Sequence, residues 1–210
     1  MIKILVADDH TIVREGLKQI VGDVGDMMVA DEAGNGQEAL QKIREGDYDV
    51  ILLDISMPGR SGLEVLKDIR AERPKLPVLI LSMHSEEQYA VRALRAGASG
   101  YLTKASAPDE LIGAIRKVSR GRKYVTASLA EKLALELDAD TRKPPHEMLS
   151  DREYQVMLML ASGKAVKEIA DELCLSVKTI STYRSRILEK MNMKKNAELT
   201  LYAIQNSLVS

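Results

Sequence analysis

Carboxylate, hydroxyl and amine side chains follow short apolar runs in the first half of the chain; they are Asp8, Asp9, Asp54, Ser82 and Lys104. Carboxylates gathered at one place repel one another unless a cation or an amine lies between them. Mg²⁺ binds such carboxylates together with phosphate oxygens, and a lysine ammonium can bind a phosphoryl oxygen as a compact charge. A carboxylate beside Mg²⁺ can also act as a nucleophile and form an aspartyl phosphate. These residue types therefore predict phosphoryl transfer, with Asp54 as the nucleophile.

Five apolar runs of strand length alternate with amphipathic segments of helix length over residues 1–120. The expected strands are 2–6, 27–31, 50–53, 78–81 and 99–102, and the expected helices are 11–21, 37–45, 63–70, 86–95 and 109–120. This alternation is typical of successive βα units around a parallel sheet with helices on both faces. The carboxyl ends of parallel strands meet at one edge of a sheet, where α/β proteins bind their ligands. We therefore expect the polar residues to gather at that edge.

Residues 1–120 resemble the receiver domain of two-component response regulators, because an acidic pair, a phospho-acceptor, a hydroxyl and a lysine follow strands in that order. The resemblance implies an α/β receiver with a (βα)5 doubly wound parallel sheet of the flavodoxin-like type. It also implies that Asp54 accepts a phosphoryl group from a sensor histidine kinase and thereby shifts a two-state surface. The residues implied for Mg²⁺ are Asp8, Asp9, Asp54 and the backbone carbonyl of Ser56, and those implied for the switch are Ser82, Tyr101 and Lys104.

Two histidines lie close to these positions in the sequence. His84 follows Ser82 by two residues, and two interpretations stay open: it shapes water access to an aspartyl phosphate, or it is a half-exposed loop residue. His10 follows the acidic pair and is interpreted as a packing or capping residue, because Mg²⁺ prefers oxygen ligands. Ala105 stands after Lys104 where many receivers have proline, so nothing predicts a cis peptide bond in that loop.

The sequence pattern changes after residue 120. Residues 121–147 hold a helix-like piece at 127–137 and then a charged segment with two prolines, which indicates a semi-extended linker. Residues 148–210 lack strand signals, and their helical segments are 150–161, 166–173, 176–191 and 197–205. Only residues 174–176 join the second and third of these helices, a spacing typical of a helix-turn-helix. We therefore expect a receiver domain at 1–120, a linker at 121–147 and an all-α four-helix domain at 148–210.

Charge is divided unevenly along the chain. The whole sequence has a formal charge of -1, and residues 1–120 hold 16 basic and 19 acidic side chains, whereas residues 176–195 hold 6 basic and 1 acidic. A local excess of this kind favours phosphate binding. In a helix over 176–191, the apolar side chains Ile180, Ile187, Leu188 and Met191 share one face, and small hydroxyl residues on the opposite face allow approach to base edges. The alternative is a solvated amphipathic helix. The expected DNA contacts are Lys178, Thr179, Ser181, Thr182, Tyr183, Arg184, Ser185 and Arg186.

Residues 149–197 resemble the LuxR-type helix-turn-helix of the NarL/FixJ class of regulators. The matching positions are 149–153, 160–163, 167–170, 175–180 and Lys190, and residues 183–186 look most like the GacA/UvrY branch. Ala165 and Val166 depart from the usual polar pair of the class, and Tyr183 stands where histidine is common. The resemblance implies binding to double-stranded DNA as a homodimer, because paired half-sites need a two-fold partner. The carboxyl-terminal helix at 197–205 is a candidate dimer contact.

Composition excludes several other classes of protein. The chain has no Trp and no Phe, which disfavours base stacking on single strands, and its single Cys rules out an internal disulfide framework. No apolar run is long enough to span a bilayer, and the amino terminus lacks a signal-peptide pattern, so we expect a cytoplasmic protein without a membrane partner. Two alternatives are a Mg²⁺-dependent phosphohydrolase and a pseudo-receiver that acts without phosphate. Ser56 stands where such hydrolases need a second acid, so we expect no enzyme.

Overall fold

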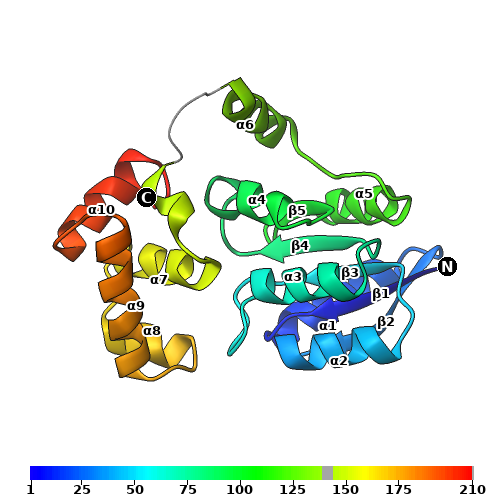
Figure 1. The fold of residues 1–210 in the computed structure, drawn as a ribbon. Coiled ribbons are helices and arrows are strands. Elements are labelled where there is room, and N and C mark those ends of the chain that lie inside the picture. The colour runs from blue at the N-terminus through cyan, green and yellow to red at the C-terminus, as the bar shows by residue number, and fades with distance from the viewer. Residues whose placement is uncertain (139–143, 210) are drawn as a thin grey trace. The chain divides into compact units, whose positions relative to one another are not determined.

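The computed structural model of the chain describes residues 1–138 and 144–209 (Figure 1). The chain divides into two compact units, Met1–Ala134 and Leu135–Ser210, and each is described by itself. Residues 139–143 of the expected linker lie outside the described residues. Within the described ranges, no helix is both long enough and apolar enough to cross a membrane.

The first unit is built on a parallel sheet of five strands in the order β2-β1-β3-β4-β5. The strands are β1 (Ile2–Ala7), β2 (Met27–Ala33), β3 (Val50–Leu53), β4 (Val78–Ser82) and β5 (Gly100–Thr103). β1 and β3 are direct neighbours, and the last residues of the two strands, Ala7 and Leu53, are paired. Every residue of β3 and β4 is buried, as expected for strands covered on both faces. The predicted (βα)5 parallel sheet is confirmed.

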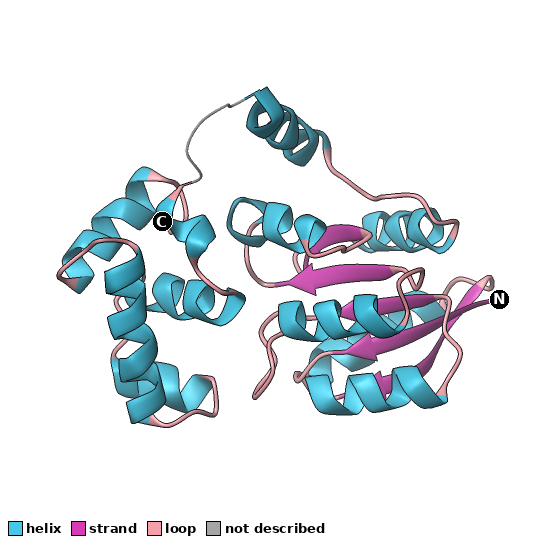
Figure 2. Cartoon of the chain, viewed as in Figure 1, coloured by secondary structure: helices cyan, strands magenta, loops and turns pink. Residues whose placement is uncertain are grey.

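Five helices cover the two faces of this sheet (Figure 2). They are α1 (Thr11–Gly22), α2 (Gly36–Glu45), α3 (Gly62–Glu72), α4 (Glu86–Arg95) and α5 (Pro108–Ser119). α1 and α5 share one core cluster, into which β1 contributes Ile4 and Val6. Local signals begin two of the helices: the Asn35 side chain accepts the Glu38 N–H at α2, and Ser61 forms a capping box at α3.

The segment after α5 returns to the sheet and lies beside β5. Tyr124 forms a parallel β-bridge with Gly100. Glycine is required at this contact, because a Cβ atom on Gly100 would lie 2.8 Å from the Tyr124 backbone oxygen. Next along the chain, the Thr126 hydroxyl donates to the Glu86 carboxylate at 2.7 Å, and α6 (Ala127–Asp138) begins. The first unit thus continues past residue 120, where the sequence pattern changes.

The second unit is helical throughout its described elements, which are a 3₁₀ helix η1 (Pro145–Met148), α7 (Asp151–Ala161), α8 (Val166–Glu172), α9 (Val177–Lys190) and α10 (Asn196–Gln205). α7 contacts each of the other three α-helices, so the four predicted helices are confirmed. The 3₁₀ helix differs from the expected extended linker. The His146 Nδ1 atom lies 2.7 Å from the hydroxyl of Tyr202 on α10, and this contact ties the 3₁₀ helix to the second unit.

A buried carboxylate ties α7 to α9. Glu153 accepts the Ser150 N–H at 2.8 Å in the capping box of α7, and it accepts the Lys190 ammonium at 2.7 Å. Burial raises the pKa of Glu153, but the hydrogen bonds from Lys190 and Ser150 outweigh burial and hold that pKa below its ordinary value. The charged form of Glu153 is therefore favoured by folding.

Candidate functional site

Three carboxylates meet at the carboxyl edge of the sheet. Asp8 and Asp9 follow β1 and Asp54 follows β3, and because these strands are neighbours, the Asp54 N–H donates to the Ala7 carbonyl at 2.9 Å. Asp8 and Asp54 are each only 2% exposed, whereas Asp9 is partly exposed. The sheet therefore brings together the acidic residues that were predicted to share a site.

Lys104, from the loop after β5, lies between two of the carboxylates. Its Nζ is 2.6 Å from Asp8 Oδ2 and 2.9 Å from Asp54 Oδ2. Burial raises the pKa of Asp54 above its ordinary value, and the Asp8 charge adds to this, while the Lys104 charge opposes it. Burial lowers the pKa of Lys104, but the two carboxylates raise it above its ordinary value. One ammonium thus serves two buried carboxylates, which leaves the cluster net negative.

The oxygens that Lys104 does not contact form a candidate cation site. Asp54 Oδ1 is buried and has no hydrogen-bond partner among the described residues. One donor atom from each of Asp8, Asp9, His10 and Asp54 can be chosen so that all four lie within 4.8 Å of one another. An unpartnered buried carboxylate oxygen beside further carboxylates fits a hard divalent cation. The Ser56 N–H donates to the Asp54 carboxylate. The backbone carbonyl of Ser56 remains a predicted ligand of the cation.

The side chain of His10 makes different contacts from those of the sequence interpretation. His10 is the N-cap residue of α1, as the capping interpretation places it, but its side chain is 60% exposed and makes no capping hydrogen bond. The Nδ1 atom instead faces the acidic pair, at 2.9 Å from Asp9 Oδ1 and 3.3 Å from Asp8 Oδ1. The backbone causes this direction, because the His10 N–H donates to Asp8 Oδ1 at 2.9 Å and turns the chain back toward Asp8.

Two of the three expected switch residues, Ser82 and Tyr101, lie in one hydrogen-bonded group around His84, whereas the third, Lys104, lies between Asp8 and Asp54. Ser82 is fully buried, and its hydroxyl accepts the His84 N–H at 3.2 Å. Tyr101 is also fully buried, and its hydroxyl donates to the His84 carbonyl at 2.7 Å. The His84 Nε2 atom lies 3.0 Å from the Ser56 hydroxyl, beside the acidic cluster. His84 therefore connects the loops that follow β3 and β4, and both of its sequence interpretations stay open.

Sequence reasoning missed Gly62, the first residue of α3. A Cβ atom there would lie 1.9 Å from the Asp54 carbonyl oxygen, so no other residue fits without moving the backbone beneath Asp54. The Gly62 N–H also donates to the Ile55 carbonyl at 2.8 Å. The signal available in the sequence was a glycine directly before the predicted start of the helix, which helix propensity disfavours without a packing reason.

In the second unit, α9 presents the face that the sequence predicts. Ile180, Ile187, Leu188 and Met191 are buried, whereas Lys178, Ser181, Thr182, Ser185 and Arg186 are exposed. The remaining expected contacts, Thr179, Tyr183 and Arg184, are partly exposed.

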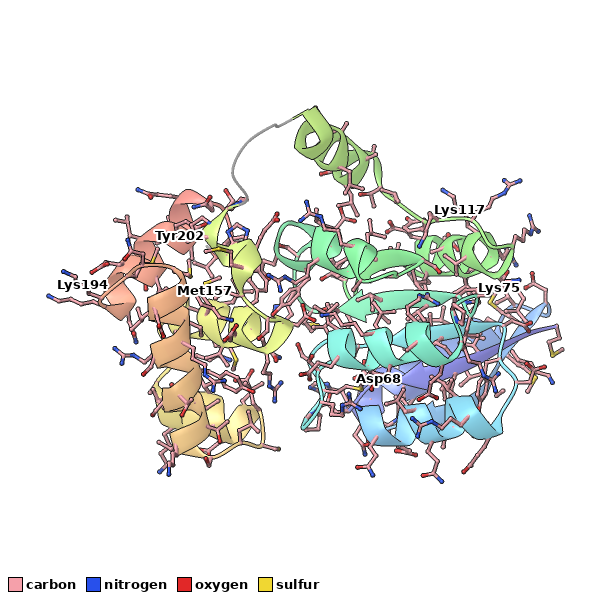
Figure 3. The ribbon with its side chains drawn as sticks, viewed as in Figure 1. Asp68, Lys75, Lys117, Met157, Lys194 and Tyr202 are labelled. Carbon is pink, nitrogen blue, oxygen red and sulfur yellow. The ribbon has the colours of Figure 1, made fainter. Side chains whose placement is uncertain are left out.

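Two of the basic residues counted in the sequence already have partners inside this unit. Arg184 donates to Asn196 Oδ1 at 2.7 Å, and Lys190 donates to Glu153. Lys178, Arg186, Lys194 and Lys195 are exposed, and Figure 3 shows Lys194 extending away from the turn after α9. Of the two paired residues, only Lys190 contacts a carboxylate, because Asn196 is neutral and leaves the charge of Arg184 uncompensated.

Comparison with known proteins assigns both parts of the chain. Residues 4–116 match the family described as response regulator receiver domain, and residues 147–203 match the bacterial regulatory proteins of the luxR family. The response regulator GacA of Pseudomonas syringae pv. syringae is 39% identical over 210 residues, which cover 100% of this chain and 98% of that one. The response regulator UvrY of Escherichia coli is 38% identical over 209 residues, covering 99% and 96% of the two chains.

Solved structures agree with this assignment. RcsB of Salmonella enterica serovar Typhimurium, bound to the promoter rprA in the presence of the phosphomimetic BeF3-, is 26% identical with a TM-score of 0.66, covering 96% of this chain and 97% of that one. A LuxR-family two-component response regulator from Aurantimonas is 36% identical with a TM-score of 0.60, covering 65% of this chain and 97% of that one. The chain therefore belongs to the response regulators that combine a receiver domain with a LuxR-type helix-turn-helix domain, and it resembles the GacA/UvrY branch over its full length.

Proposed function

We propose that a sensor histidine kinase transfers a phosphoryl group to Asp54 and that this modification controls the binding of the second domain to double-stranded DNA. The observation that carries the proposal is the state of the Asp54 carboxylate. One of its oxygens is held by Lys104, and the other is buried without a hydrogen-bond partner among the described residues. A carboxylate that is fixed through one oxygen, and whose other oxygen makes no hydrogen bond, suits attack on phosphorus.

The residues around Asp54 divide the work of phosphoryl transfer. An oxygen of Asp54 forms a bond to phosphorus while the bond between phosphorus and the kinase histidine breaks, and the leaving imidazole takes up a proton. Asp8, Asp9, Asp54 and the Ser56 carbonyl would hold Mg²⁺, which would supply positive charge beside the phosphoryl oxygens. Lys104 already lies within hydrogen-bond distance of Asp54, so a small movement brings its ammonium onto a phosphoryl oxygen.

Phosphorylation adds charge next to the hydrogen-bonded group formed by Ser82, His84 and Tyr101. The Ser82 hydroxyl is only weakly held in place, because it accepts a single long hydrogen bond, from the His84 N–H at 3.2 Å. A phosphoryl oxygen is a stronger acceptor for that hydroxyl. We infer that reorientation of Ser82 alters the position of His84 and, through the His84 carbonyl, the environment of Tyr101. This sequence of contacts biases a two-state surface around β5 and the helices beside it.

The second domain reads duplex DNA with α9. Its exposed small side chains, Ser181, Thr182 and Ser185, allow the helix to approach base edges. Lys178 and Arg186 are exposed at the same surface and contact phosphates, together with Thr179, Tyr183 and Arg184 at the flanks. RcsB, which is similar to this chain over 96% of its length, has been solved on promoter DNA, which supports this mode of binding.

The active form is a homodimer, because a helix-turn-helix reads paired half-sites through a two-fold axis. α10 offers two large exposed apolar side chains, Leu201 (57% exposed) and Ile204 (54%), for this contact. The domain limits of 1–120 and 148–210, with a linker at 121–147, belong to the same proposal, and the family assignment favours the cytoplasm. We propose no turnover of phosphomonoesters, because Ser56, at the position of the second acid, is bonded to His84.

Labelling with acetyl phosphate and Mg²⁺, followed by intact mass spectrometry, tests the phospho-acceptor. We expect one phosphoryl group on the full chain and none on the Asp54→Asn variant. Asp68→Asn serves as the matched control, because Asp68 is a partly exposed carboxylate on α3 that pairs with Arg60 away from the cluster. Labelling that persists in Asp54→Asn contradicts the proposal. Duplex affinity that is equal before and after labelling contradicts the proposed control of DNA binding.

A further inference from the structure

His10 completes a mixed set of donors with the acidic pair. The His10 Nδ1 atom lies 3.3 Å from Asp8 Oδ1 and 2.9 Å from Asp9 Oδ1. A carboxylate oxygen of Asp54 belongs to the same cluster. Asp54 is 2% exposed, and its Oδ1 atom is buried without a hydrogen-bond partner among the described residues. The second oxygens of Asp8 and Asp54 are occupied by Lys104. The donor atoms that Lys104 does not contact therefore face one place, where His10 Nδ1 and Asp8 Oδ1 are also within hydrogen-bond distance of each other.

The separations agree with ligands around one metal ion. In an octahedral site with bonds of about 2.1 Å, adjacent ligands lie about 3.0 Å apart and opposite ligands about 4.2 Å apart. The two distances from His10 Nδ1 match adjacent ligands, and the whole set spans no more than 4.8 Å. A small contraction brings the four donors onto one cation.

We propose that His10 Nδ1 is a protein ligand of the divalent cation at this site and that it gives the site selectivity for first-row transition ions over Mg²⁺. Imidazole nitrogen suits transition metals, and affinity for such nitrogen and oxygen donors rises along the series from Mn²⁺ to Co²⁺ and beyond. Mg²⁺ gains little from a nitrogen donor, because it prefers oxygen ligands and keeps several waters. The inference concerns the cation of the proposed phosphoryl-transfer site and rests on that site only for its location.

The direction of His10 supports a ligand role over a purely structural one. The side chain is 60% exposed, so it contributes little to the core. The His10 N–H bond to Asp8 fixes the backbone so that the ring returns to the carboxylates. The exposed fraction also leaves room for the ring to adjust when a cation binds.

Electron spin-echo spectroscopy of the full chain loaded with Mn²⁺, in a form without a histidine tag, tests nitrogen ligation directly. We expect nitrogen modulation from a bound imidazole in the wild type and its loss in His10→Gln. The chain has three histidines, so His84→Gln and His146→Gln are matched controls, and both should keep the modulation. A wild type without nitrogen modulation, or modulation that persists in His10→Gln, overturns the inference.

Titration calorimetry with Co²⁺ and Mg²⁺ tests selectivity on the same variants. We expect the ratio of Co²⁺ to Mg²⁺ affinity to fall about tenfold or more in His10→Gln, in line with the loss of one metal-site contact. An unchanged ratio refutes the assigned selectivity. If the wild type is not labelled by acetyl phosphate, the proposed phospho-acceptor is contradicted. The nitrogen modulation does not depend on labelling, so it tests the role of His10 separately.

Discussion

Two substitutions at the acidic cluster are expected to change the stability of the receiver in opposite directions. Lys104→Met removes the ammonium that lies 2.6 and 2.9 Å from two buried carboxylates. Breaking a buried ion pair from one side costs about 3–5 kcal/mol, because a buried charge is left without compensation. Asp54→Asn removes a carboxylate instead and leaves Lys104 paired with Asp8 alone. This exchange is expected to stabilise the folded receiver, because it removes a carboxylate whose charged form is disfavoured by burial.

The pKa of Asp54 explains why Asp54→Asn should stabilise the receiver. Burial raises the pKa of Asp54 in the folded state, so the folded protein holds this proton at pH values where the unfolded chain has lost it. Stability therefore falls as the pH rises from the ordinary value of 3.8 through the folded pKa. At neutral pH the buried charge of Asp54 lowers the free energy of unfolding, and the neutral asparagine side chain avoids this loss. The pH dependence over that window should be weaker in Asp54→Asn.

Urea-dependent hydrogen–deuterium exchange of peptides from β1 and β3 measures this effect for the receiver separately from the helical unit. The measurement is made with chelator and then with Mg²⁺, which should restore part of the loss in Lys104→Met, because the cation replaces the missing ammonium. The double variant Asp54→Asn with Lys104→Met should lose less than the sum of the single effects predicts, by about 0.5–3 kcal/mol. A loss below about 1 kcal/mol in Lys104→Met would refute the electrostatic reasoning.

Three further predictions concern other parts of the chain. Gly62→Ala should destabilise the receiver and reduce acetyl phosphate labelling, because the added Cβ atom would lie 1.9 Å from the Asp54 carbonyl oxygen. Gly16→Ala is the control, because a Cβ atom there meets nothing within 4 Å. Equal thermal midpoints of unfolding in the two variants would contradict the prediction. Glu153→Gln should lower the free energy of unfolding of the second unit by about 1–2 kcal/mol above pH 4.5 and by less below it. The reason is that folding lowers the pKa of Glu153, so its carboxylate stabilises the fold until it is protonated. An equal loss of urea stability across that pH range would argue against this prediction. Arg186→Ala should lower the slope of log affinity for duplex DNA against log salt by about 1, and an unchanged slope in fluorescence anisotropy titrations would remove Arg186 from the phosphate contacts.

The fold was predictable because most strands carry a strong local signal. β3 is four aliphatic residues, all buried, and no other element type suits such a short apolar run beside turn residues. β2 is weaker, since it lies at the sheet edge and only Met27 and Ala33 among its seven residues are buried. The strand predicted at 27–31 therefore stops two residues before the end of β2 at Ala33.

The composition of the acidic cluster was predictable, and its contacts were not. The order of residue types at strand ends places Asp54 near the acidic pair once the strands are parallel neighbours. The direction of His10 depends on a backbone hydrogen bond to Asp8, and the need for Gly62 depends on its approach to the Asp54 carbonyl. Both are tertiary effects that residue spacing does not encode. Arg184 is a similar case, because its partner Asn196 lies beyond the end of α9.

The pairing of Tyr124 with Gly100 has a consequence for any receiver fragment made from this chain. β5 is the outer strand of the sheet on that side, and an outer strand with open backbone groups is a template for pairing with another molecule. A fragment that ends at residue 120 lacks Tyr124 and exposes this edge, so it should aggregate more readily than one that runs through Ala134, the last residue of the compact unit. In the whole chain, the same segment acts as a cover that keeps β5 from recruiting a foreign strand.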